Sequence, residues 1–205
     1  MPNWCWTQIR ITSCSEEKLK DLCEKIKEWT SKPYIKNDWD NNWLGNVVGF
    51  SGIAKWNEED HNFHSELGIV ACRGCIESVD YKDGNLQINT ETAWTPMVQL
   101  WELICQKYLY DDYELFYVAE EGGNCIYTTN DPNVEGTYII DIYDTPPDDL
   151  EWESQWEVSE EVVIKFCQEA FKTDETDLDK LLELAGESEW VGINKYEYCE
   201  IEYCS

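Results

Sequence analysis

Apolar and polar positions alternate along residues 4–12, which is the period of a β-strand with one buried face. One face carries Cys5, Thr7, Ile9 and Ile11, and the opposite face carries Trp4, Trp6, Gln8 and Arg10. Beyond Ser15, a typical helix cap, the apolar spacing changes to three and four residues. The sequence therefore predicts an amphipathic helix whose apolar stripe is formed by Leu19, Leu22, Cys23 and Ile26.

The segment over residues 31–65 is rich in Trp, Asn and Gly and lacks a clear period. A long loop is expected there, with at most one short strand at residues 50–56. Strand patterns return at residues 66–81 and 85–92. Between them, Asp83-Gly84 suits the positive φ angles of a tight turn, so the two strands should form a hairpin.

A helix is expected from Thr95-Pro96 to about Leu109, because threonine can cap a helix and proline fits its first turn. Further strands are expected at residues 113–119, 125–129 and 137–143. The order strand, helix, strand, strand, helix, strand predicts an α+β fold. In this fold a ferredoxin-like split βαβ antiparallel sheet has two helices on one face, and the last two predicted strands would extend the sheet.

Two consecutive prolines, Pro146 and Pro147, interrupt regular structure and mark the expected domain boundary. The first domain would cover residues 1–145, and an α/β extension packed on it would cover residues 146–205. Within the extension, the pattern predicts a helix capped by Ser159, a second helix and a final strand, at residues 162–171, 178–185 and 195–203. We therefore expect an acidic C-terminal helical extension that ends in a strand.

Charge changes this picture, because the 205 residues include 43 acidic and only 15 basic side chains, for a formal net charge of -28. Eleven Trp residues and 14% aromatic residues overall argue against a disordered chain. Such an excess of acid disfavours direct binding to nucleic acid or to an anionic membrane surface. Residues 1–145 and residues 146–205 each have a net charge of -14, so the extension holds half of the excess in under a third of the chain.

Three segments together resemble one protein family. They are Met1-Pro2-Asn3-Trp4-Cys5, Glu91-Thr92-Ala93-Trp94-Thr95-Pro96 and Tyr117-Val118-Ala119-Glu120-Glu121-Gly122, with a weaker match at Gly52-Ile53-Ala54-Lys55-Trp56. Over about residues 1–130 the chain is similar to the YubB-like, ferredoxin-like family of small proteins carried by bacteriophages and plasmids. The resemblance implies a ferredoxin-like fold and an origin on a mobile element, and it implies no catalytic residues. The chain departs from the family at Met97, where a second proline is common, and in its acidic extension.

Cysteine usage indicates the compartment. No basic segment followed by an apolar run opens the chain, and no apolar run is long enough to cross a membrane. We therefore expect a protein of the cytosol, here that of a bacterial host. Thiols stay reduced in that compartment, so the ten cysteines should be mostly small buried hydrophobic residues.

One set of side chains has the types that ligate zinc: His61, His64, Cys72 and Cys75. Only seven residues separate the two pairs, and the cysteines would point to opposite faces of a strand unless the chain turns at Gly74. The set is thus a weak metal candidate, with a redox dithiol and unliganded side chains as the alternatives. No nucleophile elbow, phosphate loop or dinucleotide motif is present, so we expect no enzyme and no cofactor.

The combination of acidity, Trp and Tyr, and the mobile-element resemblance points to a binding protein. We expect an inhibitor of a host nucleic-acid-targeting defence enzyme, of the anti-CRISPR or anti-restriction type, which acts by nucleic-acid mimicry or by blocking a conformational change. Carboxylates can occupy a basic channel, and aromatic side chains can anchor the contact. The expected contact residues are Asp148, Asp149, Glu151, Trp152, Glu153, Trp156, Glu157, Glu160 and Glu161. For both tryptophans, packing of the extension onto the sheet is the alternative.

Other functions remain open at this point. A small-molecule binding protein could hold a nucleotide signal between the sheet and the segment over residues 31–65, although the acidic field disfavours a phosphorylated ligand. A viral structural or assembly protein is a third class. Some ferredoxin-like sheets bind RNA through aromatic side chains, and Trp4, Trp6 and Phe116 could act in this way. RNA binding requires a basic surface, however, and the sequence lacks one.

Overall fold

The computed structural model describes residues 3–35, 40–143, 146–147 and 150–201. The chain divides into two compact units. The first unit comprises residues 1–126 and 199–205, and the second unit comprises residues 127–198. Within the described ranges, no helix is both long enough and apolar enough to cross a membrane.

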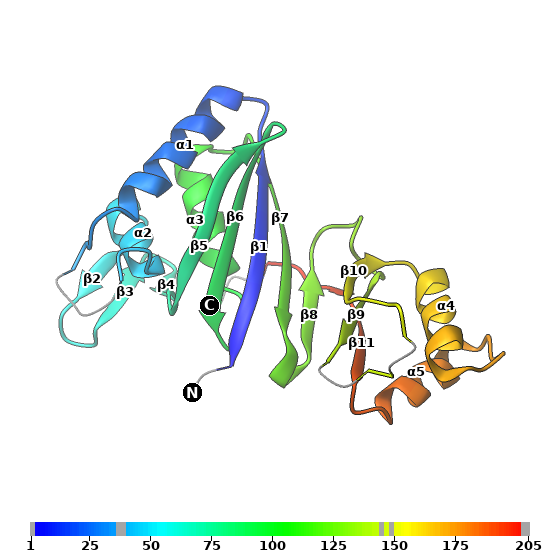
Figure 1. The fold of residues 1–205 in the computed structure, drawn as a ribbon. Helices are drawn as coiled ribbons and strands as arrows, with labels where there is room; N and C mark the ends of the chain where they lie inside the picture. The colour runs from blue at the N-terminus through cyan, green and yellow to red at the C-terminus, as the bar shows by residue number, and fades with distance from the viewer. Residues whose placement is uncertain (1–2, 36–39, 144–145, 148–149, 202–205) are drawn as a thin grey trace. The chain divides into compact units, whose positions relative to one another are not determined.

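The first unit is a mixed α+β structure (Figure 1). Its helices are α1 (Glu16–Trp29), α2 (Leu44–Ser51), α3 (Val98–Tyr108) and a 3-10 turn at Gly122–Asn124. Its strands are β1 (Trp4–Thr12), β2 (Lys55–Asn57), β3 (Asn62–Ser65), β4 (Gly68–Val70), β5 (Gly74–Lys82), β6 (Asn85–Ala93) and β7 (Glu114–Glu121). Four strands lie in the order β7-β1-β6-β5, with every neighbouring pair antiparallel. The three short strands β2, β3 and β4 form a separate antiparallel sheet.

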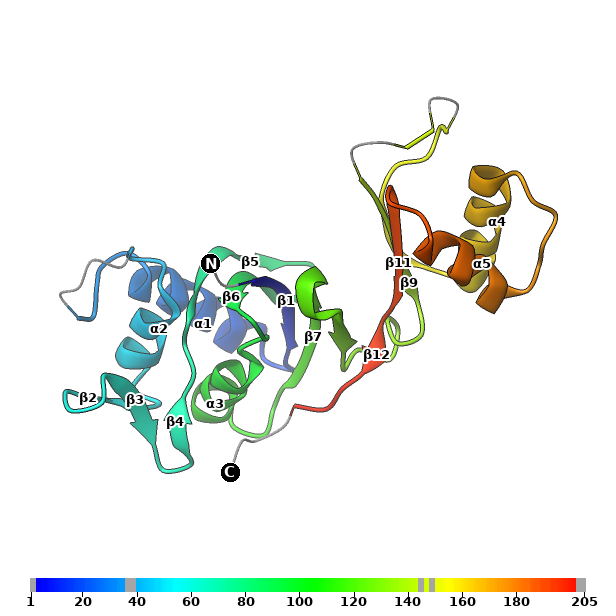
Figure 2. The same cartoon turned by 90° about the horizontal axis from the view of Figure 1, so that it is seen from below.

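The alternation along β1 decides which face of this sheet is buried. Cys5, Thr7, Ile9 and Ile11 are buried, whereas Trp4 and Trp6 on the opposite face are 52% and 37% exposed. The buried face packs with α1 and α3 into one hydrophobic core, and both helices lie on that side of the sheet (Figure 2). The predicted strand, the helix stripe and the cap are confirmed, because the Ser15 side chain accepts a hydrogen bond from the Lys18 backbone N–H.

The segment over residues 31–65 is not a long loop. It contains α2, which the sequence analysis missed, together with β2 and β3. Leu44, Val47 and Val48 are fully buried at the spacing of a helix. The pattern is hard to detect because glycine and asparagine separate these apolar residues over only eight positions.

The expected hairpin is confirmed in β5 and β6, with φ angles of 52° at Asp83 and 82° at Gly84. The expected strand over residues 66–81 is wrong in its first half, because β4 ends at Val70 and β5 begins only at Gly74. The predicted cap of the next helix is also wrong. Helix α3 begins after Met97, and the Thr95 carbonyl instead accepts a hydrogen bond of 2.8 Å from the Thr92 hydroxyl.

The second unit is also α+β. Its elements are β8 (Ile126–Thr129, which begins at the last residue of the first unit), β9 (Tyr138–Ile142), β10 (Gln155–Val158), α4 (Glu160–Phe171), α5 (Leu178–Gly186), β11 (Val191–Lys195) and β12 (Glu197–Tyr198). Strands β10, β9 and β11 form an antiparallel sheet in that order, and β12 pairs parallel with β8. The core of this unit is formed by Ile140, Val163, Phe166, Cys167 and Leu181, all fully buried.

Several expectations for the C-terminal part need correction. Strand β9 belongs to the small sheet of the second unit and does not extend the sheet of the first. The units divide after residue 126, whereas the boundary was expected after residue 145. The proline pair lies between β9 and β10, which pair with each other, so it interrupts a connection inside the second unit. Both expected helices are present, Ser159 makes no side-chain cap, and the final strand pattern resolves into β11 and β12.

The cysteines are less uniformly buried than expected. Among the described residues, Cys5, Cys23, Cys105 and Cys167 are buried, Cys72 and Cys75 are partly buried, and Cys14, Cys125 and Cys199 are exposed. All nine are free thiols. Burial raises the pKa of Cys167 to about 11, which keeps this thiol protonated and unreactive while the second unit is folded.

Candidate functional sites

The predicted acidic surface lies on the second unit, around β10 and the start of α4. Five of its acids are described, and all of them are exposed: Glu151, Glu153, Glu157, Glu160 and Glu161. None of the five forms an ion pair within the described part of the chain, because the lysines Lys165 and Lys180 contact other carboxylates. Asp148 and Asp149 lie outside the described residues. The acidic surface is therefore defined here as the five described glutamates.

The two tryptophans expected beside this surface have different environments. Trp152 packs edge-on against Phe166 at a ring distance of 5.3 Å, and its Nε1 donates a 2.7 Å hydrogen bond to Glu169. Trp156 is 56% exposed on β10. The contacts of Trp152 thus lie inside the second unit, which differs from the expected packing of the extension onto the sheet. Trp156 is the one of the two that is available to a partner.

The local backbone explains why Trp156 is exposed. Among the described residues, strand β10 pairs only with β9, so it forms an edge of its sheet. Its register shifts between Gln155 and Val158, and Glu157 has a φ of 54°. Such an irregularity re-aims side chains on the bulged strand. Trp156 and Glu157 are consequently both exposed, while Gln155 and Val158 on either side are half-buried.

The four residues of the weak zinc candidate do not form one metal site in the described structure. His64 Nε2 lies 2.6 Å from Asp60 Oδ2, and the His61 ring packs 6.0 Å from the Trp56 ring. Burial raises the pKa of Cys72 to about 12, so this thiol holds its proton. Among the described residues, one group of three side chains could hold a metal ion. Of the four residues of the zinc candidate, that group includes only Cys75.

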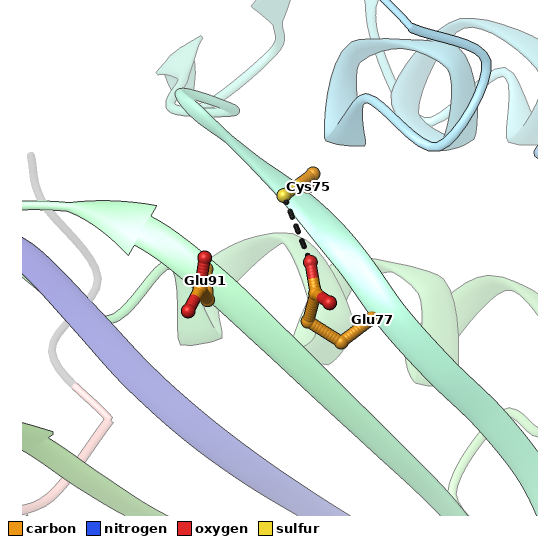
Figure 3. Close-up of side chains that lie close together, drawn as sticks. All are labelled: Cys75, Glu77 and Glu91. Carbon is orange, nitrogen blue, oxygen red and sulfur yellow. Dashed lines mark hydrogen bonds between the residues drawn. The ribbon is translucent and has the colours of Figure 1, made fainter.

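That group is Cys75, Glu77 and Glu91, whose ligand atoms all lie within 4.8 Å of one another (Figure 3). Cys75 stands directly opposite Glu91 in the β5–β6 register, and a register shift between Ile76 and Ser78 brings Glu77 to the same side. The Cys75 thiol donates a 3.3 Å hydrogen bond to Glu77. Burial, with the neighbouring carboxylates, raises the pKa of Cys75 to about 11. A thiolate with two carboxylates has ligand types that zinc accepts, but an ion would first have to displace this proton.

Cys75 and Glu77 also line a pocket of about 530 Å³ in the first unit. Three tryptophans, Trp4, Trp43 and Trp94, are among the residues that line the pocket, and we call it the tryptophan pocket. The remaining wall consists of Asp40, Asn42, Arg73, Gly74, Cys75, Glu77 and Ala93. Trp94 is 42% exposed, and its φ is 74°.

A larger pocket of about 840 Å³ lies beside it, where the segment over residues 31–65 meets β4 and the connection to β5. His61 and Cys72 of the zinc candidate both line this pocket, together with Trp43, Trp56 and Arg73. Nε1 of Trp56 is buried without a hydrogen-bond partner in the described structure. The two pockets occupy the region where a small-molecule site was expected.

The side chains considered for RNA stacking are only partly available. Trp4 and Trp6 are exposed on the open face of the sheet. The Phe116 ring is covered by Arg10, whose guanidinium carbon lies 4.4 Å from the ring centre. The open face also carries Glu91 and Glu120, which face Trp6 from either side. These carboxylates would repel a phosphate backbone.

Comparison with known proteins gives no relative. No family model, no curated protein and no solved structure matches the chain.

Proposed function

We propose that this chain is a phage or mobile-element inhibitor that binds a basic surface of a host nucleic-acid-targeting defence enzyme, of the anti-CRISPR or anti-restriction type, and that it is not itself an enzyme. The observation that carries the proposal is the exposed Trp156 beside five exposed glutamates that form no ion pair with any described residue. Carboxylates that no described lysine neutralises are available to a partner. An exposed indole among them supplies the apolar anchor that charge alone lacks.

Electrostatics favours a protein partner over nucleic acid. The second unit has 20 acidic and 4 basic residues, so its field repels polyanions and attracts cationic surfaces. Proteins that hold DNA or RNA line their channels with Lys and Arg. A surface of carboxylates steers itself to such a channel and competes there with the phosphate backbone. We infer a cytosolic site of action in the bacterial host, because the defence enzymes of this proposal work there.

The first unit is proposed to be a ferredoxin-like scaffold of the YubB-like type. Its order β1, α1, β5, β6, α3, β7 and its sheet order β7-β1-β6-β5 support this assignment, with α2 and the small sheet inserted after α1. The sequence resemblance over about residues 1–130 supports the same scaffold and the mobile-element origin.

The test uses the full chain as bait in host lysate at low salt, followed by elution with rising salt and by challenge with added DNA or RNA. A variant with Glu151, Glu153, Glu157, Glu160 and Glu161 changed to Gln removes five charges from the acidic surface. The matched control changes Asp174, Asp179, Glu183, Glu187 and Glu189 to their amides, which removes five exposed charges elsewhere on the same unit.

We expect the captured nucleic-acid enzyme to elute with salt, to be displaced by nucleic acid and to be lost from the first variant only. Trp156→Ala should weaken binding about 30-fold, the usual effect of removing an interface anchor worth about 2 kcal/mol. Equal losses in the two five-charge variants would show that net charge acts without a defined surface. Capture that persists at high salt and with nucleic acid bound would contradict mimicry.

A second candidate function is small-molecule binding in the first unit. The specific observation is the pair of neighbouring pockets that share Trp43 and Arg73. Calorimetry against a panel of nucleotides separates this candidate from the first. Tight binding of a nucleotide by the chain, unaffected by the five-Gln variant, would favour it over inhibition by the acidic surface.

A further inference from the structure

The tryptophan pocket of the first unit combines an indole lining with carboxylates, and we propose that it binds an organic cation bearing methyl groups, such as a quaternary or methylated ammonium group. This site is separate from the acidic surface, because every residue that lines it belongs to the first unit. The proposal is therefore independent of the proposed inhibition through the acidic surface, and it names a ligand class for the second candidate function.

The indole lining is the first argument. Trp4, Trp43 and Trp94 come from the start of β1, from the residue before α2 and from the residue after β6. The antiparallel register places Trp4 opposite Ala93, next to Trp94, and an isolated bridge pairs Trp43 with Cys75. Three segments far apart in sequence thus bring their tryptophans to one pocket of about 530 Å³, within the usual range for ligand sites. The face of an indole is the best aromatic partner for a cation.

The conformation of Trp94 is the second argument. Its φ of 74° lies in the left-handed region, which a bulky side chain rarely adopts. The turn is held by hydrogen bonds from the Trp94 N–H to the Asn3 carbonyl, 2.9 Å, and from the Thr95 N–H to the Ala93 carbonyl, 3.0 Å. The indole remains 42% exposed, so core packing does not account for the strain. Strained backbone that presents an exposed aromatic ring at a pocket is typical of a binding site.

Charge selects the class of ligand. Asp40 and Glu77 line the pocket, and the carboxylate of Glu91 lies within 4.8 Å of the Glu77 carboxylate. None of the three forms an ion pair with a described residue. Arg73 is the cation of the wall, and it also lines the larger pocket. An anionic ligand would therefore meet two wall carboxylates, with Glu91 next to one of them, and a single guanidinium, whereas these carboxylates would attract a cation.

Hydration decides between kinds of cation. An ammonium group without methyl groups is strongly hydrated and gains little by entering an apolar pocket. A methylated ammonium group sheds water easily and presents methyl groups to the indole faces, and aromatic cages bind such groups by the cation–π interaction. The apolar lining and the carboxylates together favour the methylated cation. A divalent metal at Cys75, Glu77 and Glu91 is the competing occupant.

The experiment titrates the full chain with choline and with 3,3-dimethylbutan-1-ol, its neutral analogue of the same shape, and follows indole N–H signals by NMR together with heats by calorimetry. A peptide with trimethyllysine, compared with the same peptide carrying unmodified lysine, tests whether the cation comes from a protein side chain. We expect choline or the trimethyllysine peptide to bind at least tenfold more tightly than its neutral or unmethylated counterpart. Tenfold corresponds to about 1.4 kcal/mol.

Variants locate the site. Trp94→Leu and Glu77→Gln should each weaken cation binding about tenfold, and the Gln substitution keeps the fold of β5 because Glu77 is exposed. Trp6→Leu removes an exposed indole outside the pocket and should leave the affinity unchanged. Equal affinity for the neutral analogue would overturn the proposal. So would zinc binding at this site that methylated cations do not displace, or the absence of saturable binding up to about 10 mM cation.

Discussion

The two units of this chain differ in charge and in core size: the first has the larger hydrophobic core, and the second has the higher density of acidic residues. The first unit, 133 residues, holds 23 acidic and 11 basic residues around a core that joins a sheet to α1 and α3. The second unit has 72 residues, with 20 acidic and 4 basic, and a smaller core around Phe166 and Leu181. The unit with less apolar area to stabilise it thus has the higher density of like charge.

This difference is informative because like-charge repulsion destabilises a compact state. A charge pattern that served only solubility would have no reason to concentrate on the smaller core. The exposed aromatic residues differ in parallel. In the first unit, Trp4 and Trp94 border a pocket, whereas in the second, Trp156 stands on an edge strand among carboxylates. We therefore infer that the first unit is suited to enclosing a small ligand and the second to contacting a surface.

The largest expected effect on stability comes from truncating one buried side chain in the core of each unit. Trp101 and Phe166 are both fully buried, and truncation of such a side chain to alanine costs about 3–5 kcal/mol. Trp101→Ala should increase the thiol reactivity of Cys105 in the first unit, and Phe166→Ala that of Cys167 in the second. Mass spectrometry after labelling in mild denaturant measures both sites at once.

Trp156→Ala is the control for these core variants, because the side chain is 56% exposed and its removal should change stability by no more than about 0.5 kcal/mol. If Phe166→Ala exposed Cys105 as strongly as Cys167, the two units would unfold as one and the comparison between them would fail.

The sequence predicted the elements whose period is unbroken. The faces of β1, the stripe of α1 and the turn at Asp83-Gly84 are local features, and each is present. Helix α2 was missed because Gly45, Asn46 and Gly49 interrupt its short apolar stripe. The cap expected at Thr95 failed because the preceding Trp94 adopts a left-handed turn, which local propensity does not indicate.

For the candidate sites too, features that are local in the sequence could be predicted, and features that depend on folding could not. The acidic surface could be predicted because its members are adjacent in the chain, although the contrast between Trp152 and Trp156 could not. That contrast depends on Glu169 and Phe166, which only folding brings to Trp152. The tryptophan pocket could not be predicted from the sequence, because it depends on the register between β1 and β6 and on the φ angle of Trp94.

A smaller effect is expected from salt. Salt screens the repulsion between exposed charges. The second unit has the higher density of like charge, so salt should reduce its repulsion more than that of the first unit. Raising the salt concentration from about 0.05 M to 0.5 M should stabilise the second unit by roughly 1 kcal/mol more than the first, the size of a few exposed charge interactions. The measurement is the ratio of Cys167 to Cys105 labelling rates in denaturant at each salt concentration. A ratio that does not fall with salt would show that the acids of the second unit do not destabilise it.

The smallest effect tests one carboxylate of the second unit that stabilises the fold. Glu175 accepts hydrogen bonds from the backbone N–H groups of Asp177 and Thr176, at 3.0 and 2.9 Å, and from Lys180 Nζ at 3.0 Å. The Asp177 N–H, with these other partners, lowers the pKa of Glu175 from its ordinary 4.5 to about 2. A lowered pKa in the folded state means that this stabilisation is complete above about pH 4.5 and is lost as the pH falls toward 2.

Glu175→Gln should therefore destabilise the second unit at neutral pH, and its difference from the unaltered chain should shrink below pH 4.5. Glu187→Gln removes an exposed charge at the end of α5 and serves as the matched control, with no change in its effect over that range expected from hydrogen bonding. Denaturant unfolding followed by circular dichroism at several pH values gives the comparison. A Glu175→Gln effect that stays constant down to pH 2 would mean that its charge contributes nothing.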